Sequence, residues 1–305
     1  MDDLKRVLVF IPAFNEEQMI GEIIDRLQQL YSDDQAEEKG FKVELLVVED
    51  GSTDGTEAVV RSRGIPIISH PKNLGLGAAT RTAMEASYGM GVDVALKFDA
   101  DSQYLPEDLE NVIRPILEDK ADICWGSRFR GKINYKMPLI RVAGNYFFTW
   151  LMNKLTDYEI SDAQTGLMAF NRKYLKIFNI IGNYNPPQQL LMDANHKRMR
   201  FIEVPIRFNA RTTGESFVSY KYPFYALFNL FRVVVYANPL KIFSFIGISF
   251  IILALIYFLL WKFMMDYIEE EFFITNLALV LVLLGVQSLF FGIIADLIVK
   301  IKTWK

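Results

Sequence analysis

Short apolar runs alternate with helical periodicity through the first 125 residues of the chain. Five runs have the length of buried strands, and they cover residues 7–11, 43–48, 65–68, 92–98 and 123–125. Between them apolar residues recur three or four positions apart, which predicts helices over residues 20–30, 53–63, 77–87 and 106–117. This alternation is typical of an α/β domain in which helices cover a mostly parallel sheet.

Two longer apolar segments follow, at residues 242–261 and 272–295, and neither contains a charged side chain. Each is long enough to cross a hydrocarbon core of about 30 Å as a helix, at about 1.5 Å per residue. A core helix of a soluble domain normally keeps a polar stripe, and these segments have none. We therefore expect a two-span anchor in contact with membrane lipids, and a homo-oligomer could form through the same helices.

The charges around these segments predict an orientation. Lys and Arg lie outside the spans, at Arg232 and Lys241 before the first and at Lys300, Lys302 and Lys305 after the second. The segment that connects the spans is mainly acidic. The positive-inside rule therefore places both termini, and everything before residue 240, on the cytoplasmic side.

A third membrane signal precedes the first span. Pro223 suits the first turn of a helix. Five apolar residues then recur at helical spacing: Phe224, Leu227, Phe228, Phe231 and Val235. The stripe predicts an amphipathic helix at the membrane interface, although it would also suit packing on the soluble domain. The expected divisions are an α/β domain over residues 1–218, an interfacial helix over 219–239 and the anchor over 240–305.

Composition narrows the function classes. Half of the residues (51%) are apolar and the net charge is −3, which argues against a disordered chain and against a nucleic-acid binder that neutralises phosphates. The single cysteine, Cys124, excludes a disulfide framework, and two histidines are too few for a His-rich metal site or a catalytic triad. An acidic start and Pro12 within the first apolar run argue against a secretory signal peptide.

Polar residues collect where the predicted strands end. Ligands of parallel sheets bind beyond the carboxyl ends of the strands, and here those ends carry Asn15, Glu16, Asp50, Asp99, Asp101, Ser127 and Arg128. Asp99-Ala100-Asp101 is the sharpest signal, because two neighbouring carboxylates can hold a hard divalent cation that neutralises a diphosphate. The sequence has no P-loop and no complete G-x-G-x-x-G motif, so ATP and NAD are not expected ligands.

Three motifs in this order resemble the signature of the family 2 glycosyltransferases, which have the GT-A fold. They are residues 11–17 (IPAFNEE), 48–56 (VEDGSTDGT) and 99–103 (DADSQ). Within the family the chain looks most like the dolichol-phosphate mannosyltransferase and polyprenyl-phosphate glycosyltransferase group. The match continues through residues 126–129 (GSRF), 161–166 (SDAQTG), 211–216 (RTTGES) and the two spans, so it covers nearly the whole chain.

The resemblance implies a donor site for a nucleotide-sugar. Four residues would line its base and ribose pocket, with the last accepting from base N–H groups: Pro12, Phe14, Glu16 and Asp50. Asp99 and Ala100 would lie beside the nucleoside. Asp101 and Gln103 would hold Mg²⁺ or Mn²⁺ against the diphosphate, and Arg211 would close over the same phosphates.

The resemblance also implies an acceptor-phosphate site at Arg128, Arg141 and Asn145. Arg141 and Asn145 are four residues apart on a helix expected to begin at Pro138, so they share a face. A guanidinium suits bidentate contact with phosphate. The implied reaction moves one hexose, from a GDP-mannose or UDP-glucose type of donor, to dolichyl or polyprenyl phosphate at the cytoplasmic face of the membrane. The product would be a lipid-linked sugar donor for glycosylation.

The ionisation of the implied acceptor determines the mechanism that we expect. A lipid monophosphate has a second pKa near 6, so it is largely dianionic at neutral pH and needs positioning more than deprotonation. A single in-line attack on the anomeric carbon would invert its configuration. Two alternatives stay open: a transferase for a lipid hydroxyl or a glycan, with Asp162 as general base, and a membrane-anchored sugar-nucleotide binding protein without turnover. A Gln-x-x-Arg-Trp motif is absent, which favours single transfer over polymer synthesis.

Overall fold

A computed structural model describes residues 4–180, 182–183, 186–210, 235, 239–264 and 271–303. The chain divides into two compact units, Met1–Leu230 and Phe231–Lys305. Arg211, most of the expected interfacial helix and the loop between the two apolar segments lie outside the described residues.

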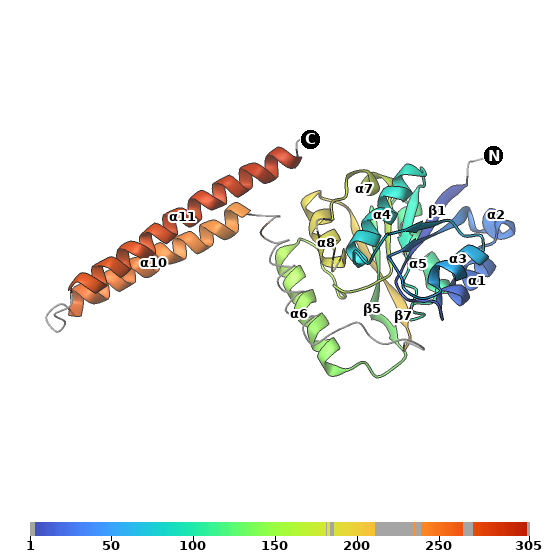
Figure 1. The fold of residues 1–305 in the computed structure, drawn as a ribbon, viewed down its shortest axis with the longest axis horizontal. Coiled ribbons are helices and arrows are strands. Elements are labelled where there is room, and N and C mark those ends of the chain that lie inside the picture. The colour runs from blue at the N-terminus through green and yellow to red at the C-terminus, as the bar shows by residue number, and fades with distance from the viewer. Residues whose placement is uncertain are drawn as a thin grey trace. The chain divides into compact units, whose positions relative to one another are not determined.

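A sheet with helices around it forms the centre of the first unit (Figure 1). The sheet has seven strands in the order β3-β2-β1-β4-β6-β5-β7. All neighbouring strands are parallel except at β6, which is antiparallel to both β4 and β5. The strands are β1 (Lys5–Ala13), β2 (Phe41–Glu49), β3 (Ile67–Ser69), β4 (Val94–Lys97), β5 (Ile123–Ile133), β6 (Met168–Asn171) and β7 (Phe201–Phe208). The expected α/β class with a mostly parallel sheet is confirmed.

Helices cover this sheet because their apolar residues recur on one face. In α1 (Ile20–Leu30), for example, Ile20, Ile24 and Leu27 are fully buried. The other helices of this unit are η1 (Asp33–Gln35), α2 (Ala36–Lys39), α3 (Thr56–Ser62), α4 (Leu76–Gly89), η2 (Pro106–Asp108), α5 (Leu109–Leu117), α6 (Leu139–Leu155), α7 (Arg172–Ile177) and α8 (Pro186–His196). The segment expected as one helix over 106–117 is therefore η2 followed by α5.

Two strands were not predicted, and both matter for the site. β6 has only four residues, and β7 carries Glu203, Pro205 and Arg207 within its eight residues, so neither forms a plain apolar run. Pro205 is tolerated because β7 is an edge strand. Since β6 runs against its neighbours, the segment that enters it lies at the edge of the sheet where β4 and β5 end.

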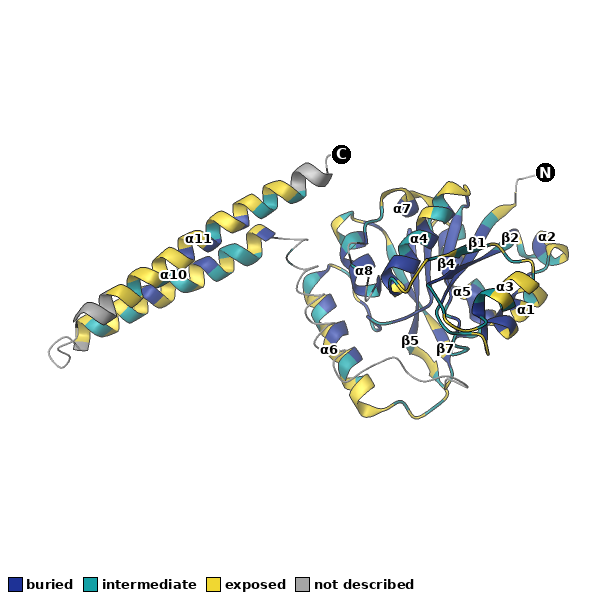
Figure 2. Cartoon of the chain, in the orientation of Figure 1, coloured by how far each residue is buried: buried dark blue, intermediate teal, exposed yellow. Residues whose placement is uncertain are grey.

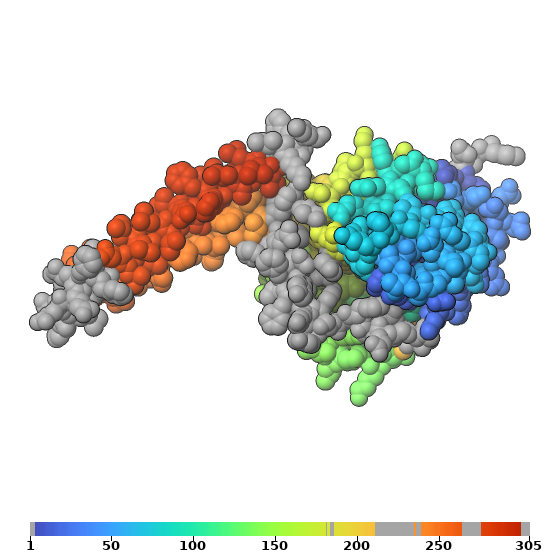
Figure 3. Space-filling model, viewed as in Figure 1, coloured from blue at the N-terminus to red at the C-terminus, as the bar shows by residue number. Residues whose placement is uncertain are grey.

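The second unit contains two long helices, α10 (Pro239–Met264) and α11 (Glu271–Thr303). Both are long and apolar enough to cross a membrane, as expected, and both exceed the predicted spans. Most of their apolar side chains are exposed (Figure 2). The helices pack along their length (Figure 3), and a Cβ on Gly247 would lie 2.7 Å from the Gly285 carbonyl oxygen. Ser288 Oγ of α11 donates a hydrogen bond to the Phe243 carbonyl of α10 at 3.0 Å.

Candidate active site

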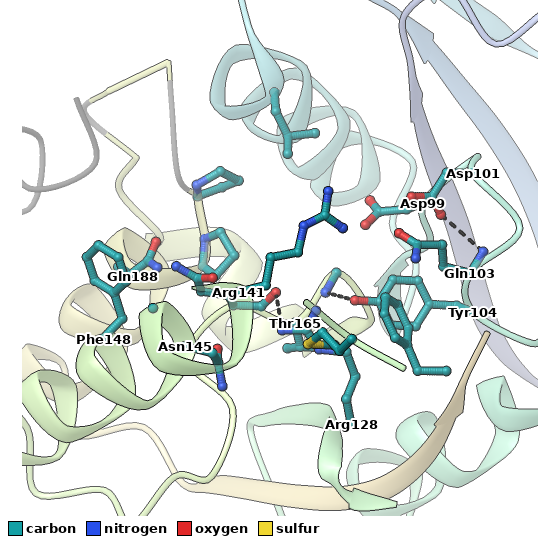
Figure 4. Close-up of a pocket in the computed structure, with 18 of the residues that line it drawn as sticks. Asp99, Asp101, Gln103, Tyr104, Arg128, Arg141, Asn145, Phe148, Thr165 and Gln188 are labelled. Atoms are coloured by element: carbon teal, nitrogen blue, oxygen red, sulfur yellow. Dashed lines mark hydrogen bonds between the residues drawn. The ribbon is translucent and has the colours of Figure 1, made fainter. Parts of the chain in front are cut away.

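A cavity of about 560 Å³ opens at the edge of the sheet where β4 and β5 end. Its lining comes from β4 and the residues after it, from β5, α6 and α8, and from the segment before β6 (Figure 4). Six of the predicted site residues line it: Asp99, Asp101, Gln103, Arg128, Arg141 and Asn145. In Figure 4 the two carboxylates and Gln103 lie at one end, Phe148 and Gln188 lie at the other, and Arg141 extends between them.

The carboxylate end offers oxygen ligands. Ser102, with φ of 58°, turns the chain in the left-handed region, and Gln103 N–H donates to Asp101 Oδ1 at 3.2 Å. Such backbone strain is common at functional sites. Gln103 Nε2 donates to the Asn209 carbonyl at 3.2 Å, which fixes the side chain and leaves its Oε1 available.

These oxygens fit a divalent cation that takes its other ligands from a substrate. Mg²⁺ usually binds one or two carboxylates together with phosphate oxygens and water. Among the described residues, no three His, Cys, Asp or Glu side chains cluster closely enough to hold a metal by themselves. Asp101 and Gln103 therefore suit a cation held jointly with a diphosphate.

Lys97 is a cavity residue that the sequence analysis did not single out. Its side chain is 1% exposed, and its Nζ contacts Asp99 Oδ1 and the Gly166 carbonyl, the latter at 3.2 Å. Tyr104 Oη accepts a hydrogen bond from Gly166 N–H, so both sides of this peptide are bound. A lysine within the apolar run of β4 was the available signal, because a buried ammonium needs a partner.

Arg128 reaches the cavity from an irregular part of β5. Ser127 pairs with Pro205 and Lys132 with Arg207, so β5 advances five residues while β7 advances two. A bulge of this kind redirects side chains. Close packing there requires Gly131, since a Cβ at this position would collide with the Ile206 backbone.

Asp162 holds the Arg128 side chain. Its Oδ2 accepts from Nε at 2.6 Å and its Oδ1 from Nη2 at 2.7 Å, while Nη2 also donates to the Gln164 carbonyl at 3.0 Å. Burial alone would lower the pKa of Arg128, but the Asp162 charge raises it above its ordinary value, so the guanidinium stays protonated. Asp162 itself is fully buried, and its carboxylate is occupied by Arg128 and by backbone N–H groups.

Two amide side chains in the cavity have atoms without a partner. Neither amide atom of Asn145 has a hydrogen-bond partner among the described residues, although the residue is only 2% exposed. The same holds for Oε1 of Gln188, which follows two prolines at the start of α8 and was not predicted. Buried polar atoms normally pair, so both positions are suited to bind a polar ligand.

The residues expected around the base and ribose lie at the same edge of the sheet but do not line this cavity. Pro12 and Ala100 are buried, and Phe14 and Glu16 are half-buried beyond β1. Asp50 is occupied on both oxygens: His70 Nδ1 contacts Oδ1 at 2.6 Å, and Leu74 and Gly75 N–H groups donate to Oδ1 and Oδ2. Among the described residues only Gly75 donates to Oδ2, and the role of Asp50 toward a base stays a prediction.

Two family profiles match this chain, one in each of its two units. The glycosyl transferase family 2 profile matches residues 8–178, more than half of the chain, and the GtrB C-terminal hairpin matches residues 238–301. The solved structure of glucosyl-3-phosphoglycerate synthase from Mycobacterium tuberculosis with phosphoglyceric acid shares the fold. Its TM-score is 0.57 at 19% identity, over 76% of this chain and 80% of that one.

Similar curated proteins include three named transferases. UDP-N-acetylglucosamine–dolichyl-phosphate N-acetylglucosaminyltransferase of Methanococcus voltae is 30% identical over 67% of this chain and 85% of its own length. Polyprenol monophosphomannose synthase of Mycolicibacterium smegmatis is 26% identical over 70% of this chain and 82% of its own. Dolichol-phosphate mannosyltransferase of Pyrococcus furiosus is 26% identical over 80% of this chain and 69% of its own.

Proposed function

Because the chain belongs to glycosyltransferase family 2 and is a glycosyltransferase, we propose that it transfers one hexose from a nucleotide-sugar to a polyprenyl or dolichyl phosphate. One observation carries this proposal: a single cavity holds oxygen ligands at one end and the Arg128 and Arg141 guanidinium groups beside them. A diphosphate with its divalent cation fits the oxygen ligands, and a second phosphate fits the two guanidinium groups.

The lining of the cavity suits a lipid phosphate. Ile140, Phe147 and Phe148 of α6 supply apolar surface next to Arg141 and Asn145. An isoprenoid chain needs such surface directly beside its phosphate, whereas a soluble glycan would need many hydrogen-bonding groups. The relatives named for dolichyl phosphate and polyprenol acceptors support the same class of acceptor.

The reaction then needs no general base. The acceptor phosphate is a dianion, and its oxygen forms the bond to the anomeric carbon while the bond from that carbon to the diphosphate breaks. The nucleoside diphosphate leaves, and the configuration inverts. No histidine or cysteine is among the described residues that line the cavity. Arg128, Arg141 and Asn145 orient the acceptor, which accounts for much of the rate of such a transfer.

A divalent cation, Mg²⁺ or Mn²⁺, would neutralise the charge that develops on the leaving diphosphate. Asp101 and Gln103 would hold it, and Asp99 would lie on its nucleoside side with Lys97. Gln188 Oε1 requires a hydrogen-bond donor, which a hydroxyl group of the sugar provides and a phosphate dianion does not. Structures of a fold relative with Mn²⁺ and UDP-glucose support a metal-assisted reaction.

The second unit would keep the enzyme beside its lipid substrate. Its two apolar helices would cross the membrane, and the Lys and Arg residues outside them support a cytoplasmic location for both termini and for the active site.

One substitution distinguishes the proposed phosphate acceptor from the alternative, a hydroxyl acceptor with Asp162 as general base. Asp162→Asn would leave Arg128 without its bidentate partner, so the KM for polyprenyl phosphate should rise about tenfold or more, while the KM for the donor changes little. The assay measures nucleotide release while the concentration of the donor or of the acceptor is varied. Polyprenol of the same length replaces polyprenyl phosphate in a parallel series. A loss of kcat at unchanged acceptor KM, together with transfer to polyprenol, would instead identify Asp162 as the base.

A further inference from the structure

Glu203 is a buried carboxylate that does not line the cavity. It lies on β7 opposite Trp125 of β5, and its side chain is only 1% exposed. It accepts three hydrogen bonds from one short turn: Ser161 N–H and Ser161 Oγ donate to Oε2, both at 2.8 Å, and Asp162 N–H donates to Oε1 at 3.1 Å.

This turn sets the direction of the Asp162 side chain. With the Ser161 and Asp162 peptides both bound to Glu203, the Asp162 carboxylate can receive Arg128 through Nε and Nη2. No described residue accepts a hydrogen bond from the remaining nitrogen, Nη1. The guanidinium therefore has one edge bound by protein, and Nη1 remains available on a residue that lines the cavity.

A second connection joins the same turn to β5. Ser161 Oγ and Ser127 Oγ lie 2.6 Å apart, and Ser127 Oγ accepts from Arg130 N–H at 3.1 Å. Ser127 directly precedes Arg128, so Glu203 is linked to both the backbone and the side chain of that arginine. Each link passes through Ser161 or Asp162.

The chemistry of the side chain explains why it is a carboxylate. Both Glu203 oxygens accept from N–H or O–H groups, and a glutamine would place an NH₂ group against one of these donors. Burial raises the pKa of Glu203, which reflects the cost of a carboxylate at this position. Arg130, whose Nε lies 3.2 Å from Oε2, is half exposed. The hydrogen bonds that Glu203 accepts from the Ser161–Asp162 turn offset that cost.

We propose that Glu203 is a positioning residue of the acceptor site, which holds the Ser161–Asp162 turn so that Arg128 presents Nη1 to the acceptor phosphate. The inference rests on the proposed function, since it takes Arg128 to bind the phosphate of the lipid. Glu203 acts through Arg128 and touches neither substrate.

Glu203→Gln is the test variant, because it keeps the shape of the side chain and removes one acceptor. Asp122→Asn is the matched control. Asp122 is also a buried carboxylate at the β5–β7 pair, but it lies at the opposite end, where Ile123 pairs with Phe201, and it binds Arg200. Both variants lose stability, but only the Glu203 variant should disturb the acceptor site.

The measurement is steady-state transfer by the full chain in detergent, with polyprenyl phosphate and the nucleotide-sugar varied separately. We expect Glu203→Gln to raise the KM for polyprenyl phosphate about tenfold, with the donor KM within about twofold of wild type. Asp122→Asn should keep both wild-type KM values. An unchanged acceptor KM in Glu203→Gln, or an equal rise of both KM values, would overturn the proposal.

A double-mutant cycle tests whether the effect passes through Arg128. The double variant Arg128→Lys, Glu203→Gln should have the same acceptor KM as Arg128→Lys alone, whereas additive effects would contradict the proposal. If Glu203→Gln does not fold, Ser161→Ala removes one of the three bonds and should raise the acceptor KM by a smaller factor. Wild-type protein that transfers no sugar to polyprenyl phosphate would remove the proposed function and this inference together, whereas an active wild type with an unaffected variant removes only the inference.

Discussion

The Gly166 peptide connects the two halves of the cavity. Its N–H donates to Tyr104, its carbonyl accepts from Lys97, and Lys97 in turn binds Asp99. Gly166 also follows the Asp162 segment that holds Arg128. A side chain at this position has no room, because a Cβ would collide with Asp99 Oδ2 and lie 2.8 Å from Tyr104 Cε2.

Gly166→Ala should therefore displace Asp99 and weaken donor binding. We expect the Kd of the nucleoside diphosphate to rise by at least about tenfold, because the carboxylate and its lysine must move together. Calorimetric titration of the purified protein, with the divalent cation present, measures this directly. Gly89→Ala is the control, since a Cβ there meets no atom within 4 Å. Equal affinity of Gly166→Ala and wild type would show that the close contact has no role in the donor site.

Cavity residues that belong to one short motif could be predicted to lie together, whereas contacts between distant segments of the chain could not. Asp99, Asp101 and Gln103 lie within five positions, so the motif alone predicted that they lie together, and they line the same cavity. Lys97 contacts Gly166, 69 residues later, and Glu203 contacts Ser161, 42 residues earlier. Such partners become neighbours only through the pairing of β4, β6, β5 and β7, which a single sequence does not reveal.

Asp122 joins β5 and β7 at the end where both strands begin. Its carboxylate accepts from Arg200 N–H at 2.8 Å and from Asn171 Nδ2 at 2.8 Å. Burial alone would raise the pKa of Asp122, but the hydrogen bonds from Arg200 and Asn171 outweigh it and lower the pKa below its ordinary value. A depressed pKa in the folded state stabilises the fold above the unfolded pKa, about 3.9, and this contribution is lost as the pH falls through the folded value.

Asp122→Asn should accordingly destabilise the protein in a pH-dependent way. The melting temperature should fall at pH 7, by roughly 2–4 °C for each kcal/mol lost, and the difference from wild type should shrink below about pH 4. Thermal melts in detergent at several pH values measure it. A difference that stays constant down to pH 3 would mean that the ionised carboxylate contributes nothing at this position.

Close contact between α10 and α11 depends on glycine. In a membrane, small residues let helix backbones approach, and a Cβ on Gly285 would lie 2.8 Å from the Gly247 carbonyl oxygen.

Gly285→Leu should separate these helices and lower the fraction of monodisperse protein that survives heating in detergent, as measured by size-exclusion chromatography. Val280→Leu adds bulk at a position that is 48% exposed, and it should behave like wild type. Equal heat resistance of the two variants would show that the close approach at Gly285 does not stabilise the hairpin.

The long apolar helices and the five regular strand runs were predictable because each carries its signal within its own residues. β6 and β7 were missed because one is very short and the other mixes charges with a proline, which an edge strand tolerates. β6 is also the one antiparallel strand of the sheet, and its direction determines where residues 161–167 lie. The alternation of strands and helices predicted the class of the fold, but the order of the seven strands depends on tertiary packing.

The whole molecule combines a glycosyltransferase domain and an apolar hairpin in one chain. In the proposed function, the hairpin would hold the enzyme in the membrane, where a water-soluble donor meets a lipid acceptor. An acceptor that is already ionised would need cations and amides rather than a general base, and the low number of histidines fits this chemistry.

Transfer of labelled sugar to lipid tests this account most directly. Purified full-length protein in vesicles with polyprenyl phosphate and Mn²⁺ is incubated with a panel of radiolabelled GDP- and UDP-sugars, and the label in the lipid fraction is measured. We expect one donor to label polyprenyl phosphate with stoichiometric release of nucleoside diphosphate, and Asp101→Ala to abolish the transfer. Absence of labelled lipid with every donor, or equal labelling when polyprenol replaces polyprenyl phosphate, would contradict the central claim.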